Sequence, residues 1–162
     1  MIHKGNILVV DDTPANLEVL VETLSLAGYT VWAVTSGKRA LKQLQTHIPD
    51  LILLDIQMPE MDGFTICEMI KANVDTAAVP VIFITAFSDT DSIVKGFSLG
   101  AVDYINKPFR DLELLARVQT HLNLRGLTQG LKEQVQKAEI AKQKAEIAKQ
   151  EAEEAKQEAD RA

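Results

Sequence analysis

The sequence predicts an α/β fold in which a five-stranded parallel sheet is covered by helices on both faces. Apolar runs alternate with amphipathic stretches through about residue 124, as in βα units that build a parallel sheet. The first run, "ILVV", has four apolar residues in succession, which favours a strand buried on both faces. The predicted strands are residues 6–11, 30–34, 50–55, 79–85 and 103–106.

The first predicted helix lies between residues with clear terminal preferences. Thr13 is a good N-cap residue, and Pro14 fits the first helical position because its fixed φ suits a helix. Gly28 ends the helix, as glycine often does. Between these ends, apolar residues recur at helical spacing: Leu17, Leu20, Val21 and Leu24.

The later helices are predicted from the same kinds of signal. Ser88 is expected to cap the fourth helix, and Gly100 to stop it. The third helix has apolar positions at Phe64, Cys67, Met69 and Ile70. The remaining helices are expected at residues 38–46, 63–73 and 89–99, and from residue 110 onward.

Composition narrows the class of protein. The 162 residues suffice for one domain with an appendage, and the net charge of −6 argues against a nucleic-acid-binding surface. The single cysteine, Cys67, excludes an intrachain disulfide and favours a reducing, cytoplasmic location. The N-terminus shows no signal-peptide pattern. The longest apolar run, residues 79–87, is far shorter than the ~20 residues that span a bilayer, so we expect no membrane segment.

Polar residues stand at the ends of four predicted strands. The first strand ends in Asp11 and Asp12, the third in Asp55, the fourth in Thr85, and the fifth is followed by Lys107. The carboxyl ends of parallel strands meet at one edge of a sheet, where ligands bind in such folds. We therefore expect these five side chains to lie together.

Three carboxylates at one edge repel one another by ~4 kcal/mol per pair at 4 Å and an effective dielectric of 20. A hard divalent cation removes this cost, and oxygen-only ligands favour Mg²⁺. A metal beside a carboxylate, an amine and a hydroxyl suits phosphoryl transfer. Asp55 is the natural nucleophile because its strand is central, while Lys107 and Thr85 can contact phosphoryl oxygens.

Several motifs resemble the receiver domain of two-component response regulators. They are "VVDD" at residues 9–12, "LLDIQMPEMDG" at 53–63, "FITA" at 83–86 and "GAVDYINKPF" at 100–109. The resemblance covers roughly residues 5–124, so we assign residues 1–124 to a receiver domain of the chemotaxis type. It implies a doubly wound, flavodoxin-like sheet with strand order 2-1-3-4-5.

The resemblance also implies a role for each site residue. Asp12 and Asp55 ligate Mg²⁺ directly together with the main-chain carbonyl of Gln57, and Asp11 acts through water. Asp55 accepts the phosphoryl group from a histidine kinase or phosphotransfer protein. The residues that contact the phosphoryl group are Thr85, Ala86 and Lys107.

Further family features concern the conformational switch and the lifetime of the phosphoryl group. Thr85 and Tyr104 form the family's switch pair, in which the threonine moves inward on phosphorylation and the aromatic ring follows. The bond between Lys107 and Pro108 is cis in the family. Gln57 and Phe87 occupy the variable positions where family members tune dephosphorylation.

Other functions remain open at this point. Asp11 alone could be a helix N-cap. A Mg²⁺-dependent phosphatase with an aspartate nucleophile is the main alternative, although such enzymes have an aspartate two residues further on, where Gln57 and Thr13 stand. A structural dimerisation module with vestigial acids is the third possibility.

Residues 125–162 have a different character. "KAEIAKQ" occurs twice, at residues 137–143 and 144–150, and "EAEEAKQ" follows at 151–157. A set of positions spaced alternately by three and four residues forms a seam like that of a coiled coil, and Leu or Ala fills every one of them except Gln134. The seam positions are 127, 131, 134, 138, 141, 145, 148, 152, 155, 159 and 162.

The seam favours a homodimer through this helix. The alternative is a lone solvated helix, and two observations keep it open: alanine buries little apolar area, and Ile140 and Ile147 fall off the seam. We expect phosphorylation to alter the packing of the helix pair. By analogy of architecture, an output domain such as a histidine kinase or nucleotide cyclase is expected beyond Ala162.

Overall fold

The computed structural model of the chain describes residues 4–86 and 88–161. In this part of the chain, strands and helices alternate as predicted. The strands are β1 (Asn6–Val10), β2 (Thr30–Val34), β3 (Leu51–Asp55), β4 (Val81–Thr85) and β5 (Asp103–Asn106). The helices are α1 (Pro14–Leu26), α2 (Gly37–Leu44), α3 (Gly63–Ala72), α4 (Thr90–Ser98) and α5 (Asp111–Arg161).

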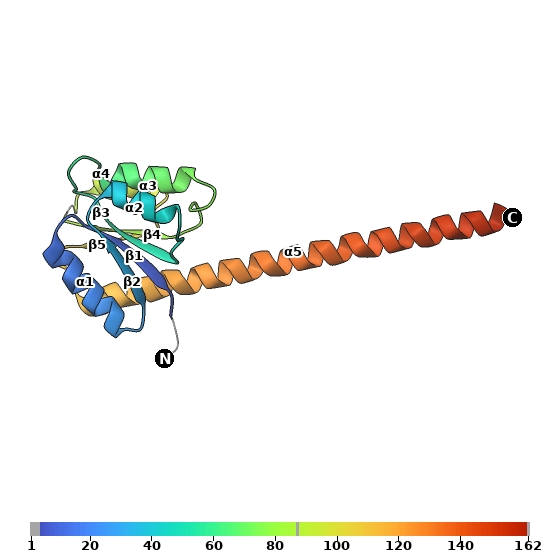
Figure 1. The fold of residues 1–162 in the computed structure, drawn as a ribbon, viewed down its shortest axis with the longest axis horizontal. Coiled ribbons are helices and arrows are strands. Elements are labelled where there is room, and N and C mark those ends of the chain that lie inside the picture. Colours follow the sequence, from blue (N-terminus) through green and yellow to red (C-terminus); the bar gives the residue numbers. More distant parts are fainter. Residues whose placement is uncertain (1–3, 87, 162) are drawn as a thin grey trace. The chain divides into compact units, whose positions relative to one another are not determined.

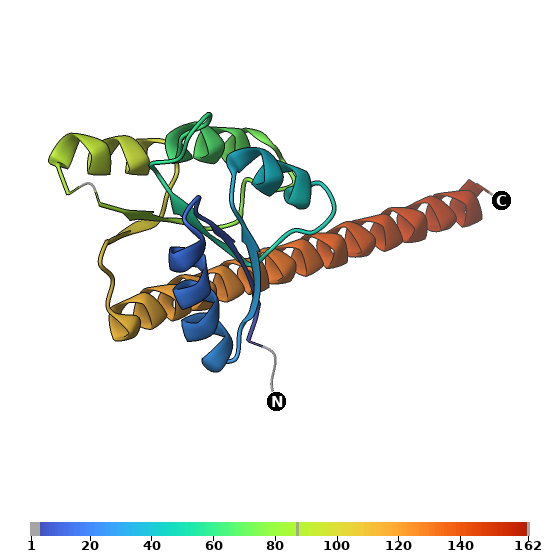
Figure 2. The same cartoon turned by 60° about the vertical axis from the view of Figure 1, so that its left-hand side comes forward.

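The strands form one parallel sheet with the order β2-β1-β3-β4-β5, which confirms the predicted fold class. Helices cover both faces: α2, α3 and α4 lie on one face, and α1 and the start of α5 lie on the other (Figures 1 and 2). The ends of β1 and β3 are neighbours at the centre of the sheet, which is where the candidate acids are placed.

Each face of the sheet carries its own apolar core, because successive side chains of a strand point to opposite faces. In β1, Leu8 and Val10 pack with the cluster under α2 and α3, whereas Ile7 and Val9 pack with α1 and α5. All four are buried. The fully apolar strands of the sequence therefore follow from burial on both sides.

Some element ends differ from the sequence prediction. The fourth helix is capped by Asp89, not Ser88, because the Asp89 side chain accepts a 2.9 Å hydrogen bond from the backbone N–H of Ser92. Thr13 stands at the N-cap of α1, but its side chain makes no capping hydrogen bond. Met69, expected on the apolar face of the third helix, is exposed.

Strand β4 begins at Val81, two residues later than predicted. Pro80 has no N–H to donate to the ladder, although its carbonyl still accepts from Ile52 at 2.9 Å. Val79 and Pro80 are nevertheless buried, so the apolar run marks burial and not the strand limits alone.

The chain divides into two units, Met1–Arg125 and Gly126–Ala162. We call the second unit the tail. Helix α5 passes through the division, and every described tail residue is exposed. None of the helices described is both long enough and apolar enough to cross a bilayer.

Candidate functional site

Three aspartates converge at the carboxyl edge of the sheet. Asp11 and Asp12 follow β1, and Asp55 is the last residue of β3. One carboxylate oxygen from each lies within 4.8 Å of the others. Asp11 and Asp55 are buried, whereas Asp12 is half-buried. The structure thus brings together the three acids that the sequence placed at neighbouring strand ends.

Hydrogen bonds fix two of these carboxylates. Oδ1 of Asp11 accepts from the backbone N–H of Thr13 at 2.9 Å, and its Oδ2 accepts from Nδ2 of Asn16 at 3.4 Å. Oδ1 of Asp55 accepts from the backbone N–H of Gln57 at 3.2 Å. The turns after β1 and β3 therefore orient the acids of this cluster.

Lys107 joins the two buried acids. Its Nζ atom lies 3.0 Å from Oδ2 of Asp11 and 3.3 Å from Oδ2 of Asp55. Its backbone N–H donates to the carbonyl of Thr85 at 2.9 Å, so the chain after β5 is tied to the end of β4. The peptide bond between Lys107 and Pro108 is cis.

A close approach of α3 supports the end of β3. The N–H of Gly63 donates to the carbonyl of Ile56 at 2.8 Å. A Cβ at Gly63 would collide with backbone atoms of Asp55 and Ile56, so only glycine lets the helix start here. The contact holds Asp55, the last residue of β3, and Ile56, which follows it, against the first turn of α3.

The electrostatics of the cluster favour a cation. Burial, and then the charge of Asp11, raise the pKa of Asp55, and Lys107 offsets this only in part. Burial lowers the pKa of Lys107, but its contacts with Asp11 and Asp55 outweigh burial and raise it overall. The Lys107 ammonium contacts two of the three carboxylates, those of Asp11 and Asp55. The all-oxygen donor set fits a hard divalent cation.

The remaining predicted residues lie around this cluster. Thr85 ends β4 and is buried, and Ala86 follows it and is exposed. Gln57 is exposed beside Asp55. Phe87 lies outside the described residues.

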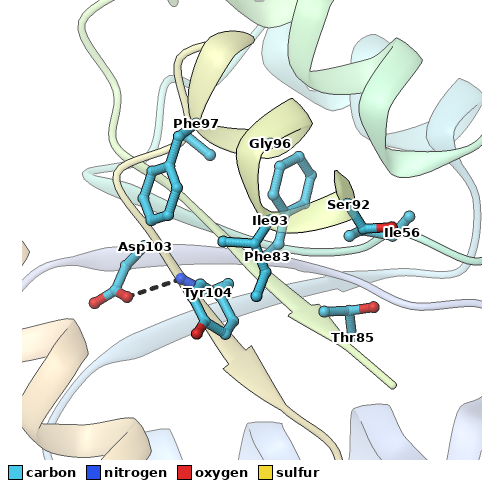
Figure 3. A pocket seen from close by; sticks show the side chains of 10 residues that line it. Ile56, Phe83, Thr85, Ser92, Ile93, Gly96, Phe97, Asp103 and Tyr104 are labelled. Atoms are coloured by element: carbon cyan, nitrogen blue, oxygen red, sulfur yellow. Dashed lines mark hydrogen bonds between the residues drawn. The ribbon is translucent and has the colours of Figure 1, made fainter. Parts of the chain in front are cut away.

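Tyr104 lies on β5 next to β4, and its ring is 6.1 Å from the ring of Phe97 on α4. Tyr104 and Thr85 line a common cavity of about 10 Å³, room for roughly one water molecule (Figure 3). Phe83 and Gly96 contribute to the same wall. The cavity gives the two proposed switch residues a shared space.

One charged cluster was not anticipated from the sequence. Asp103, next to Tyr104, accepts from Nη1 of Arg117 at 2.7 Å and contacts Nε2 of His121 at 3.0 Å. Its Oδ1 also accepts from the N–H of Tyr104 at 2.8 Å (Figure 3). The four-residue spacing of Arg117 and His121 was the available signal, because it puts both on one face of a helix.

Comparison with known proteins places these features in a family. The family model of the response regulator receiver domain matches residues 7–119. A probable transcriptional regulator ycf27 of Cyanidium caldarium is 42% identical over 120 residues, which cover 74% of this chain and 47% of that protein. A probable cyclic di-GMP phosphodiesterase of Vibrio cholerae is 44% identical over 121 residues, covering 75% and 27%.

A solved structure is also similar to this chain. A putative response regulator from Chloroflexus aurantiacus is 36% identical, with a TM-score of 0.71, and the match covers 74% of this chain and 98% of that one. The chain spans about half or less of the length of the two relatives named above.

Proposed function

This chain belongs to the response regulator receiver domain family, and on that premise we propose that Asp55 accepts a phosphoryl group in a Mg²⁺-dependent reaction. The observation that carries the proposal is the convergence of Asp55 with Asp11, Asp12 and Lys107 at one edge of the sheet. The donor is a histidine kinase or a phosphotransfer protein, as is general for receiver domains.

The transfer forms one bond and breaks another. A carboxylate oxygen of Asp55 attacks phosphorus, and the bond from phosphorus to the donor's histidine nitrogen breaks. That nitrogen keeps the electron pair and takes up a proton. Asp55 becomes an acyl phosphate, and Lys107, already 3.3 Å from its Oδ2, is placed to contact a phosphoryl oxygen.

Asp11, Asp12 and Asp55 would hold Mg²⁺ together with the main-chain carbonyl of Gln57, with Asp11 acting through water. When bound, the metal supplies positive charge that offsets the charge of the acids and of the phosphoryl group. Thr85 and Ala86 stand at the end of β4, where they can contact the remaining phosphoryl oxygens.

Thr85 and Tyr104 form the conformational switch in this proposal. A new dianion favours the state that supplies it with hydrogen-bond donors, which draws Thr85 toward Asp55. The small cavity shared by Thr85 and Tyr104 supports this role, because the volume that Thr85 would vacate joins it beside the tyrosine ring.

We further propose that the tail dimerises and relays the state of Asp55 to an output domain outside these 162 residues. The printed names of the two relatives differ in activity, one a transcriptional regulator and the other a phosphodiesterase, although both share the receiver. This supports a separate output. We assign no nucleic-acid contact to these 162 residues because their net charge is −6.

Labelling with acetyl phosphate tests the phosphoacceptor role. Wild-type protein should be labelled in Mg²⁺ and not in chelator, and Asp55→Asn should abolish labelling. Asp75→Asn, which changes an exposed aspartate, is the matched control and should be labelled normally. Persistent labelling of Asp55→Asn would refute the assignment, and sustained multiple turnover on a soluble phosphomonoester would favour the phosphatase alternative.

A further inference from the structure

Three large apolar side chains near the start of the tail are exposed. Leu127, Leu131 and Val135 follow at intervals of four residues, and 68%, 63% and 67% of their respective surfaces are exposed. Residues four apart lie on the same side of a helix. We call these three residues the Leu/Val strip. Apolar strips on otherwise charged helices are typical of helix pairing.

We propose that the Leu/Val strip pairs in parallel with the same strip of a second copy, and that the paired stretch ends before Lys137. This inference rests on the dimer proposed above and specifies the part of the tail that makes it. A second copy fits because a symmetric pair places each strip residue beside its own equivalent, so an apolar strip meets an apolar strip.

Gly130 and Val135 favour the parallel orientation. In a parallel pair, the positions that flank the seam face each other across the helices with an offset of five residues. Gly130 of one helix thus faces Val135 of the other. A Cβ at Gly130 would meet no atom within 4 Å, so the helix surface is open there. The exposed Val135 side chain can fill this opening and extend the apolar contact.

In the alanine repeats, the same offset of five residues brings positively charged side chains of the two helices to face each other. Lys137 faces Lys142 of the second copy, and Lys144 faces Lys149. The seam residues in this region are alanines, which bury little apolar area to oppose the repulsion. An attractive pair, Glu151 of one helix facing Lys156 of the other, lies further along the sequence than both repulsive pairs. The helices therefore separate beyond the Leu/Val strip.

Ile140 and Ile147 provide a matched comparison. They are 45% and 57% exposed, so they are apolar and accessible like the strip residues. Ile140 follows Leu131 by nine residues, which at about 100° per residue puts it on the opposite side of the helix. The two isoleucines therefore lie outside the proposed contact.

Sedimentation equilibrium of the full chain, over concentrations that reach the millimolar range, tests the location of the contact. Leu127→Ala with Leu131→Ala should raise the dimer dissociation constant at least about tenfold. Ile140→Ala with Ile147→Ala should leave it unchanged. Circular dichroism should show that each variant keeps its helix. Equal loss in both double variants, or a dimer that survives the leucine substitutions, would overturn the strip as the contact.

A charge reversal tests where the pairing ends. Lys137→Glu with Lys144→Glu converts both repulsive combinations into attractive ones in the parallel arrangement. We expect association to tighten about tenfold. Unchanged or weaker association would contradict the proposed end of the paired stretch.

Disulfide trapping tests the orientation. Gln134→Cys should cross-link to itself in a parallel pair. An antiparallel pair centred on Leu131 would instead cross-link Thr128→Cys with Gln134→Cys in a mixture, and this result would overturn the proposal. Wild type is the control because Cys67 is buried. A chain that stays monomeric throughout refutes the dimer itself, whereas acetyl phosphate labelling of Asp55 reports separately on the phosphoacceptor role.

Discussion

Nζ of Lys107 lies 3.3 Å from Oδ2 of Asp55, so the lysine that follows β5 reaches the acid that ends β3. The β4 strand lies between these two strands in the sheet. The backbone N–H of Lys107 also binds the carbonyl of Thr85. A change of charge at Asp55 therefore acts directly on the segment that follows Tyr104.

Lys107→Ala should separate metal binding from the response to phosphorylation. The three carboxylates remain, so Mg²⁺ binding should be largely kept. In the proposed reaction the phosphoryl group would lose its ammonium partner, so acetyl phosphate labelling should slow by at least about tenfold. NMR of Tyr104 should show a reduced response to a fluoroberyllate mimic. Lys38→Ala, an exposed lysine on α2, is the control. Loss of Mg²⁺ binding with a normal response would show that the role assigned to Lys107 is wrong.

Asp55→Asn should stabilise the metal-free protein at neutral pH. Burial and the charge of Asp11 raise the pKa of Asp55 above its usual 3.8, so the folded state favours the protonated carboxyl. Its contribution to stability is present below pH 3.8 and is lost as the pH rises through the raised pKa. Removing the charge should raise the free energy of unfolding by about 1 kcal/mol at pH 7. Urea unfolding measures this, and Mg²⁺ should stabilise only the wild type. A less stable variant in chelator would contradict the argument.

The sheet and the acidic cluster could be predicted because both depend on local sequence and on one topological rule. Apolar runs such as residues 51–54 mark strands buried on two faces, and parallel strands bring Asp11 and Asp55 to one edge. The choice between Ser88 and Asp89 as helix cap could not be predicted. Both side chains can accept a hydrogen bond, and only the backbone path decides which one reaches the N–H of Ser92.

The contacts of Asp103 also could not be predicted from the sequence. The sequence shows an acid on β5 and bases at residues 117 and 121, but their meeting depends on how α5 packs against the sheet. The cavity beside Tyr104 could not be predicted either, because it arises from the shapes of side chains contributed by β4, β5 and α4.

Asp103→Asn should lower stability at neutral pH. Burial would raise the pKa of Asp103, but hydrogen bonds from Arg117, His121 and the N–H of Tyr104 outweigh it and lower the pKa below 3.8. The stabilisation is present above pH 3.8 and is lost as the pH falls through the lowered pKa. We expect a loss of about 1 kcal/mol at pH 7, because Arg117 is partly exposed and solvent screens the pair. Urea unfolding should show this deficit shrinking below pH 3.8, whereas Asp75→Asn should show none. A deficit that is constant across pH would contradict the assignment.

Gly96→Ala should restrict the proposed switch of Thr85 and Tyr104 by crowding the cavity that they line. A Cβ at Gly96 would lie 3.0 Å from Cε2 and 3.1 Å from Cδ2 of Phe83, which must then move within the wall shared with Thr85 and Tyr104 (Figure 3). Overpacking costs ~1–3 kcal/mol, and alanine regains about 1 kcal/mol of helix propensity, so the net loss should be about 1 kcal/mol. Acetyl phosphate should still label Asp55, but the fluoroberyllate-induced shift of Tyr104 in NMR spectra should fall. Gly126→Ala is the matched control, since its Cβ would meet nothing within 4 Å and should leave that shift intact. An undiminished shift in Gly96→Ala would mean that the Tyr104 ring does not use this cavity.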